Sequence, residues 1–287
     1  MDAIAKNVYI EDRFPGVTLG VIVQSRGLIQ IDAPPAPEDG RAWRAALMGM
    51  GNGHERVLIN LDSHPDRTLG VRAMDCTVIA HEKTARAFQN RPNTFKAQGD
   101  ETGANWEAIP GLGSVRWAPP EISFMSKMSL HWSDAPVILE SHPGPTEGAI
   151  WVILPEEKIV FVGDAVVKGQ PPFLAHADIP AWLEALNHLQ SPRFKGYTVI
   201  SGRGGVLTSQ AIRGQVDSLK KIHSKLEKLG AKRSSAVNFT DKLADQVLKE
   251  FKAPAAKHKQ YSHRLRFGLR NYHARHYVSA SRNIVDE

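Results

Sequence analysis

The most informative stretch of this sequence is VLINLDSHPDR, at residues 57–67. Its apolar, β-branched beginning predicts a buried strand, and that strand stops at a polar cluster containing Asp62, His64, Asp66 and Arg67. In α/β proteins, ligands and metals are usually held where strands end. The stretch therefore predicts a ligand or metal site at the edge of a sheet.

The rest of the chain has the composition of an ordinary globular protein. Its 287 residues can bury a substantial core, since 42% of them are hydrophobic and only 23% are charged. The single cysteine, Cys76, excludes an internal disulfide and fits the reducing cytosol. The N-terminus lacks the apolar segment of a secretory signal, and no apolar run approaches the roughly 20 residues that cross a bilayer. We expect a cytoplasmic protein without a transmembrane segment.

Strand and helix signals extend on both sides of this stretch. We expect strands at 7–11, 17–24, 28–32, 56–61, 76–80, 122–124, 127–131, 137–139, 149–154, 158–162 and 197–200. We expect helices at 40–51, 81–90, 179–189, 209–229 and 241–251. Residues 91–120 are rich in Gly, Pro and Asn and predict a loop insertion, of the kind that often acts as a lid. Strands with interspersed helices in two halves predict two sheets sandwiched between helices.

Small or polar residues mark four of the predicted strand ends. They are the cluster at 62–67, Gly144-Pro145-Thr146, Gly163-Asp164 and Gly202-Arg203-Gly204. Their order and spacing, over residues 7–225, resemble the metallo-β-lactamase superfamily. The resemblance implies an α/β (α+β) fold, an αββα sandwich of two mixed β-sheets flanked by helices, with a metal site at one edge. Residues 1–251 would then form this domain, with 91–120 as its insertion and 252–287 as a basic C-terminal extension.

The metal-ligand positions of that family are altered in this chain. By the resemblance, the seven positions correspond to Asp62, His64, Asp66, Arg67, Pro145, Asp164 and Arg203. Four of the seven differ from the histidine found in the family. Three of those four, Arg67, Pro145 and Arg203, carry residues that do not normally bind a metal.

The resemblance leaves room for one divalent metal at most. Asp62, His64 and Asp164 would hold zinc, iron or manganese with water in an open position. A second metal would meet Asp66, Asp164 and the two arginines, and arginine has no lone pair to offer. Like charges ~4 Å apart repel by about 4 kcal/mol at an effective dielectric of about 20, so no second metal is expected.

Arg67 and Arg203 allow two interpretations. In the first, they neutralise Asp66 and Asp164 by bidentate hydrogen bonds and replace the second metal from within the chain. In the second, they point outward and hold an anionic ligand. The first is favoured, because a buried aspartate usually has a partner.

Two histidines and a serine lie near these positions in the sequence. His142 precedes Pro145 by three residues and is either a substitute ligand or, more commonly for such a residue, a loop histidine. His176, in the loop after Asp164, either lines the site or is structural. Ser63 has no nucleophile-elbow motif around it, so we do not expect it to be a nucleophile.

Residues 252–287 carry the whole net charge of +6. They contain eight Lys or Arg and two acidic residues, and the remainder of the chain is neutral. Five of them fall on one face of a predicted helix: Tyr261, Leu265, Leu269, Tyr272 and His276. This face predicts either an oligomer contact or packing on the body of the protein. The basic face comes with no recognised nucleic-acid motif, so nucleic acid is not expected as a partner.

Three functions remain. The favoured one is a diverged, non-hydrolytic binding or assembly protein, a pseudoenzyme that forms a homo-oligomer through its C-terminal segment. The alternative is a mononuclear metal-dependent hydrolase of an ester, thioester, lactone or phosphoester, with catalysis by Asp62, His64, Asp66 and Asp164. The least favoured is a nucleic-acid-associated protein that uses the basic tail. The fold alone does not name a substrate.

Overall fold

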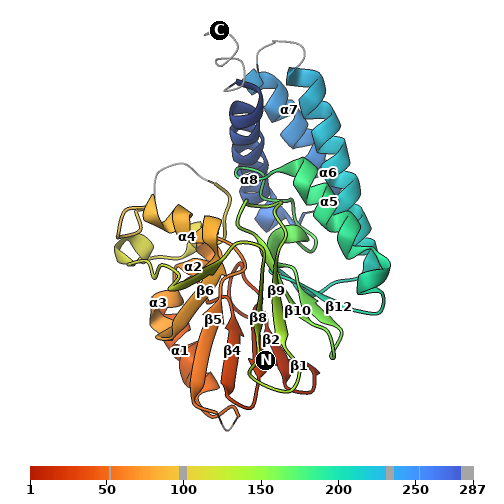
Figure 1. The fold of residues 1–287 in the computed structure, drawn as a ribbon. Coiled ribbons are helices and arrows are strands. Elements are labelled where there is room, and N and C mark those ends of the chain that lie inside the picture. The colour runs from red at the N-terminus through yellow and green to blue at the C-terminus, as the bar shows by residue number, and fades with distance from the viewer. Residues whose placement is uncertain (52, 97–101, 231–235, 252, 279–287) are drawn as a thin grey trace, which may run out of the picture.

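The computed structural model describes residues 1–51, 53–96, 102–230, 236–251 and 253–278. Two β-sheets lie face to face, and helices cover their outer surfaces (Figure 1). The predicted α/β class, an αββα sandwich of two mixed sheets, is confirmed. Residues 97–101 of the predicted insertion, and residues 252 and 279–287 of the basic extension, lie outside the described residues.

The first sheet holds seven strands in chain order. They are β1 Asp2–Ala5, β2 Val8–Glu11, β3 Leu19–Val23, β4 Gly27–Ile31, β5 Glu55–Ile59, β6 Thr77–His81 and β7 Ile122–Phe124. Strands β1 to β4 pair antiparallel, and β4 to β7 pair parallel. The sequence pattern missed β1, because its four residues are exposed or half-buried and show no apolar alternation.

The second sheet has the order β13-β12-β11-β10-β9-β8. Its strands are β8 Lys127–Leu130, β9 Val137–Ser141, β10 Ile150–Leu154, β11 Ile159–Phe161, β12 Thr198–Ser201 and β13 Gly205–Val206. The pair β11 and β12 is parallel, and the other pairs are antiparallel. The two-residue β13 was not predicted, since it is too short to carry a periodic signal.

The helices fall into two groups. On the first sheet's side are α1 Pro37–Leu47, α2 Pro65–Thr68, α3 Val71–Met74, α4 Glu82–Gln89 and the 3-10 turns η1 Trp106–Ala108 and η2 Leu112–Ser114. On the second sheet's side are α5 Ile179–Leu189, α6 Ser209–Gly230, α7 Ala236–Leu248 and α8 Ala255–His273, with the short elements η3 Gly163–Ala165, η4 Pro192–Phe194, η5 Lys249–Phe251 and η6 Ala274–Val278. In the described residues no helix is long and apolar enough to cross a membrane.

Burial follows the two-residue period of the strands. In β4, Leu28 packs outward beneath α1 and α3, whereas Ile29 and Ile31 pack between the two sheets. All five residues of β4 are buried, because both faces of the sheet are covered. The polar ends of the first sheet's strands are thus held between two apolar layers.

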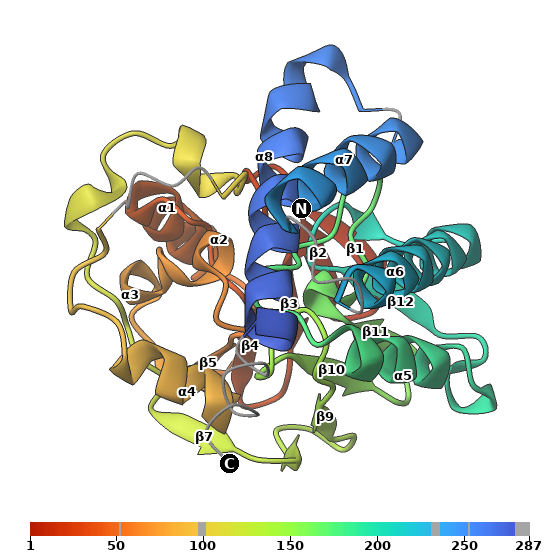
Figure 2. The ribbon, with the colours of Figure 1, turned by 90° about the horizontal axis from the view of Figure 1, so that it is seen from above.

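Helix α8 belongs to the core of the second sheet's helical layer. Its residues Tyr261, Leu265, Leu269 and Tyr272 are at most 9% exposed and pack with residues of α5, α6 and α7. Seen from above, α8 crosses the centre of the molecule, between the α1–α4 half and the α5–α6 half (Figure 2). Four of the five residues of the predicted face are therefore buried within the chain itself, whereas the fifth, His276, is exposed.

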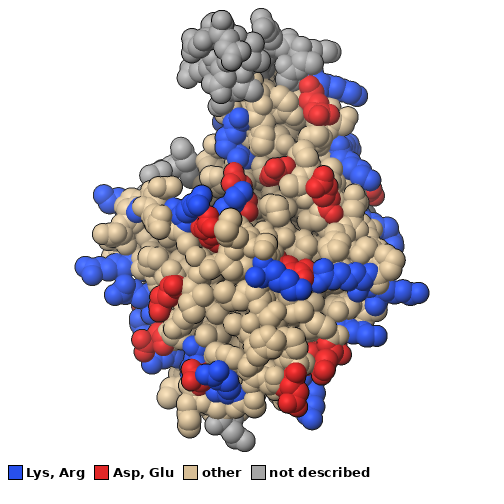
Figure 3. Space-filling model, viewed as in Figure 1, with Lys and Arg blue, Asp and Glu red and all other residues tan. Residues whose placement is uncertain are grey.

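Acidic residues of α7 offset the basic face of α8. Arg270 forms hydrogen bonds of 2.7 and 2.9 Å with the Asp241 carboxylate, and Arg266 lies 2.9 Å from Asp245. Acidic and basic side chains are also interspersed over the face of the molecule seen in Figure 3. These pairs place Arg266 and Arg270 of α8 beside acidic residues of α7.

Candidate functional site

Two pairs of parallel strands bring the predicted site residues to one edge. Ile31 of β4 is opposite Ile59 of β5, so Asp32 and Asp62 follow at the same edge of the first sheet. In the second sheet, β11 and β12 are parallel, and Asp164 and Arg203 come after them. Parallel strands end at a common edge, and this is what gathers side chains far apart in the sequence.

Gly202, which follows β12, leaves room for the guanidinium group of Arg67. The Gly202 N–H donates to the Gly163 carbonyl at 2.7 Å. A Cβ added at Gly202 would lie 2.9 Å from Nη1 of Arg67 and equally close to the Gly163 backbone. Only glycine fits there while Arg67 keeps its place.

Arg67, fully buried, contacts three aspartates from three strand ends. Its Nη1 donates to Asp32 Oδ2 at 2.6 Å, and its Nη2 donates to Asp164 Oδ1. Its Nε lies 2.9 Å from Asp62 Oδ1 as an ion pair, although that N–H makes no hydrogen bond. The single guanidinium group of Arg67 thus forms ion pairs with three carboxylates.

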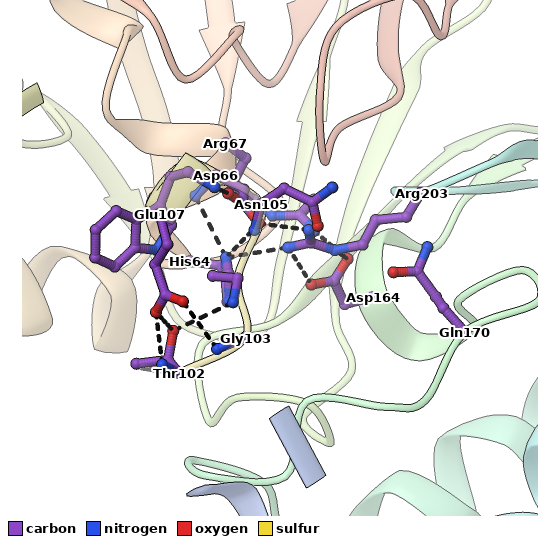
Figure 4. A network of polar contacts seen from close by, with 12 residues as sticks. His64, Asp66, Arg67, Thr102, Gly103, Asn105, Glu107, Asp164, Gln170 and Arg203 are labelled. Carbon is purple, nitrogen blue, oxygen red and sulfur yellow. Dashed lines mark hydrogen bonds and ion pairs between the residues drawn. The ribbon is translucent and has the colours of Figure 1, made fainter. Parts of the chain in front are cut away.

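Arg203 completes the cluster from the second sheet. Its Nε and Nη2 donate to the two oxygens of Asp164 at 3.0 and 3.1 Å, a bidentate pair. Its Nη1 donates to Asp66 Oδ2 at 2.5 Å, and Nη2 also donates to Nδ1 of His64 at 3.0 Å. Figure 4 shows Arg203 reaching toward Asp164 on one side and Asp66 and His64 on the other.

The predicted insertion contributes to the same cluster. The backbone N–H groups of Asn105 and Trp106 donate to the Asp66 carboxylate at 3.3 and 2.6 Å. Glu107 holds this part of the loop by accepting from the N–H groups of Thr102 and Gly103 at 2.6 and 3.1 Å (Figure 4). Aromatic packing around Trp106 gives the segment an apolar core of its own, so it forms a wall of the site.

Two opposing effects set the pKa values of the buried aspartates: burial raises them and pairing with arginine lowers them. Burial alone would raise the pKa of Asp164, but the guanidiniums of Arg203 and Arg67 hold it well below its ordinary value. Asp32 has Arg67 as its cation, and burial raises its pKa to about 6. The pKa of Asp62 is also raised, by burial and by the nearby Asp164 charge. Asp164 is therefore the most firmly ionised of these three.

His64 is a neutral hydrogen-bond acceptor at this site. Its Nδ1 accepts from Arg203 and, at 3.3 Å, from the N–H of Asp66, and both of these groups can only donate. The ring proton must then be on Nε2. Burial and the Arg203 charge lower the pKa of His64 well below its ordinary value, which agrees with a neutral ring.

The predicted metal ligands do not fit a metal ion. Asp62 and Asp164 are engaged by Arg67, and Nδ1 of His64 is engaged by Arg203. Over the described ranges, no group of three or more His, Cys, Asp or Glu residues is arranged to hold a metal. A dication placed among these groups would face two guanidiniums at close range. Pro145, which stands at another metal-ligand position of the family, has no side-chain atom that could bind a metal.

A cavity of about 170 Å³ lies beside this cluster. Its wall includes five of the residues considered from the sequence: Asp62, Ser63, His64, Pro145 and Asp164. His176 also lines it, as one of the two sequence interpretations expected. His142 does not line it, because its ring stacks on Trp151 with 3.7 Å between ring centroids.

Three charged residues of this region were not proposed from the sequence. Asp32 binds Arg67, while Arg91 and Arg264 line the cavity. Arg264 comes from α8, in the segment whose basic residues the sequence suggested as a possible nucleic-acid-binding surface. A signal for it was present: Arg264 is adjacent to Leu265 and four residues before Gly268, within the spacing of the buried face of α8. Its side chain is 1% exposed.

The described fold is similar to those of several solved structures. A metallo-β-lactamase from Pontibacter korlensis aligns with a TM-score of 0.60 and 18% identity, over 76% of this chain and 97% of its own. The DIM-1 metallo-β-lactamase aligns with a TM-score of 0.59 and 16% identity, over 77% of this chain and 96% of its own.

A longer protein matches more of the chain. The stereoselective inverting sec-alkylsulfatase Pisa1 from Pseudomonas sp. aligns with a TM-score of 0.67 and 13% identity, over 96% of this chain and 49% of its own. This chain thus spans about half of that protein. Neither a protein-family model nor a curated protein sequence matches the chain.

Proposed function

Because this chain has the metallo-β-lactamase fold, we propose that it is a diverged, metal-independent form of that fold that binds a ligand and does not hydrolyse it. The observation that carries the proposal is the pair of buried guanidiniums at Arg67 and Arg203. They contact the aspartates that the resemblance assigns to metals, including Asp66 and Asp164. In this proposal the two arginines replace the metals as the positive charge of the site.

The contacts of the cluster favour binding over hydrolysis. A hydrolase of this kind would need a group that activates water, which is either a metal or a free base. Asp164 has a lowered pKa and accepts three hydrogen bonds from arginine. His64 has its basic nitrogen occupied by Arg203. These groups are poorly placed to take a proton from water.

The metal-dependent hydrolase is the competing function. It would use one zinc, iron or manganese ion on Asp62, His64 and Asp164 to attack an ester, thioester, lactone or phosphoester. It requires Arg67 to leave Asp62 and Asp164, and so to give up two of its three ion pairs. It also requires Arg203 to leave Asp164 and Nδ1 of His64.

Metal analysis separates the two functions. The protein is purified without chelator and its metal content is measured by mass spectrometry, before and after incubation with zinc, manganese and iron. We expect substoichiometric metal and no hydrolysis of ester, lactone or phosphodiester substrates. Stoichiometric metal that is lost in Asp62→Ala or His64→Ala, together with hydrolysis, would overturn the proposal.

Oligomer formation through residues 252–287 stays a prediction. Four of the five residues of the apolar face that first suggested it are buried against α5–α7, so any contact between copies would use His276 or other residues of this segment. Sedimentation of the full chain tests it directly.

A further inference from the structure

The cavity beside the arginine cluster has two chemically distinct kinds of wall. Its apolar wall is formed by residues of the loops and of α8, namely Trp106, Phe173, Leu174 and Phe267. At about 170 Å³ it is close to the size of protein cavities of about 150 Å³ that hold benzene. The cavity is thus large enough for a small molecule with an apolar body.

Arg91 supplies a cationic wall with an unused donor. Its Nη2 donates to the Ser63 carbonyl at 2.7 Å, whereas its Nη1 is buried and has no hydrogen-bond partner in the described structure. The guanidinium lies over Trp117 and Phe88, 4.5 and 4.9 Å from their ring centroids, so it is held rigidly. A buried, charged donor without an acceptor is costly, and native proteins usually satisfy it.

Arg264 supplies a second cation, from α8. It donates only to neutral oxygens, those of Gly103, Asn105, Gln170 and Pro171. No carboxylate of the described residues lies within ion-pair distance of Arg264 or Arg91. Arg264 also stacks on Phe173, with its guanidinium carbon 3.9 Å from the ring centroid.

The carboxylates in the same wall do not cancel these two charges. Asp164 is held by Arg67 and Arg203, and Asp62 is paired with Arg67. Burial lowers the pKa of Arg91 to about 10 and that of Arg264 to about 9, values at which both stay protonated at neutral pH. The cavity therefore combines an apolar wall with two cations that form no ion pair with a carboxylate among the residues that the structure describes.

We propose that this cavity binds a small organic monoanion, whose oxyanion head group accepts from Nη1 of Arg91 near the Arg264 charge and whose apolar body packs against Phe173 and Trp106. This inference rests on the proposed binding function and names its ligand class. It uses Arg91 and Arg264, neither of which is at a metal-ligand position of the family.

Calorimetric titration of the full chain with three probes tests separately whether binding needs the negative charge and the apolar body of the ligand. The probes are benzoate, its neutral counterpart benzyl alcohol, and inorganic sulfate. We expect saturable benzoate binding in the millimolar range or tighter, and at least about tenfold weaker binding of the other two, the scale of one charge-assisted hydrogen bond. Equal binding of benzyl alcohol, equal binding of sulfate, or no benzoate binding would each overturn the ligand class.

Arginine variants locate the site. Arg91→Met should weaken benzoate binding about tenfold or more, and Arg91→Lys, which keeps the charge, should weaken it less. Arg193→Met is the matched control, because Arg193 pairs with Glu140 at the surface and does not line the cavity. Benzoate affinity that is unchanged in a folded Arg91→Met protein would refute the assignment. The probe titration on the unaltered chain decides the ligand class if that variant does not fold.

Metal content measured on the same sample distinguishes the two proposals. A metal-free protein that fails to bind benzoate refutes only the ligand class. A protein with stoichiometric metal and hydrolytic activity refutes the proposed function, whatever its affinity for benzoate.

Discussion

Replacing Arg67 with methionine is the sharpest test of the idea that arginines stand in for metals. The substitution keeps an unbranched side chain, which is shorter than that of arginine, and removes the one cation that contacts Asp32, Asp62 and Asp164. Asp164 keeps Arg203, and Asp62 keeps the His64 N–H at 2.8 Å. Asp32 keeps only the Leu61 N–H at 3.0 Å, so it loses the most.

Removing one member of a buried ion pair costs about 3–5 kcal/mol, because the other member is left charged and unpaired. We expect the free energy of unfolding to fall by about that amount near pH 8. The loss should shrink toward pH 5, since Asp32 already has a pKa of about 6 with Arg67 present and can take up a proton when the cation is gone. A protonated Asp32 is a neutral buried group, which costs far less.

Equilibrium unfolding in urea, followed by tryptophan fluorescence and circular dichroism, measures this loss. Arg193→Met is again the control, since Arg193 makes two hydrogen bonds of 2.7 and 2.8 Å with Glu140 but is 41% exposed. Its loss should be about 0.2–1 kcal/mol. A similar small loss for Arg67→Met, at both pH values, would refute the reasoning. Arg67→Lys, with the charge kept, should lose less than Arg67→Met and serves if the latter does not fold.

Three further predictions test other parts of the structure. One variant restores histidine at the four altered family positions: Asp62→His, Arg67→His, Pro145→His and Arg203→His. It should gain stoichiometric zinc, measured by mass spectrometry, and its melting temperature should rise with zinc, whereas the unaltered chain should show neither effect. Burial would raise the pKa of Glu140, but Arg193 and Lys127 hold it at about 2. The stability that ionised Glu140 gives to the fold is therefore present above about pH 4.5 and is lost as the pH falls toward 2. Glu140→Gln should flatten the acid limb of a pH–stability curve, and the exposed Glu38→Gln should leave it unchanged. Ending the chain after Phe251 removes α8 and its buried leucines, and should lower the melting temperature by on the order of 10 °C or more and abolish benzoate binding. A truncated chain with the parent melting temperature would contradict the packing of α8.

Local patterns were enough to predict the sandwich. Helix α5 was predicted at its observed bounds, and β7 likewise, because each depends on apolar spacing within one short segment. The strands that were missed, β1 and β13, carry no such spacing, since their positions depend on the strands beside them. The four-residue helices α2 and α3 were also missed, because each is too short to show a helical period. Boundaries of the other elements moved by a few residues, where capping and pairing rather than periodicity decide the end.

The sequence predicted only part of the cluster around Arg67. The aspartates and arginines at family positions could be named, and their charges alone suggested mutual neutralisation. The partner of each group depended on long-range geometry: Asp32 is 35 residues from Arg67, and Arg203 is 137 residues from Asp66. No local pattern encodes such separations.

By itself, the sequence determined the sandwich, the strand end at residues 57–67 and the presence of Arg67, Pro145 and Arg203, whose side chains do not normally bind a metal. Side-chain chemistry is a property of the residue, so a guanidinium excludes a metal ligand wherever it lies. Only the tertiary structure decided that Arg67 serves three aspartates and that Arg91 and Arg264 line one cavity. Those facts depend on which segments meet, and that is fixed when parallel strands end at one edge and a C-terminal helix packs across it.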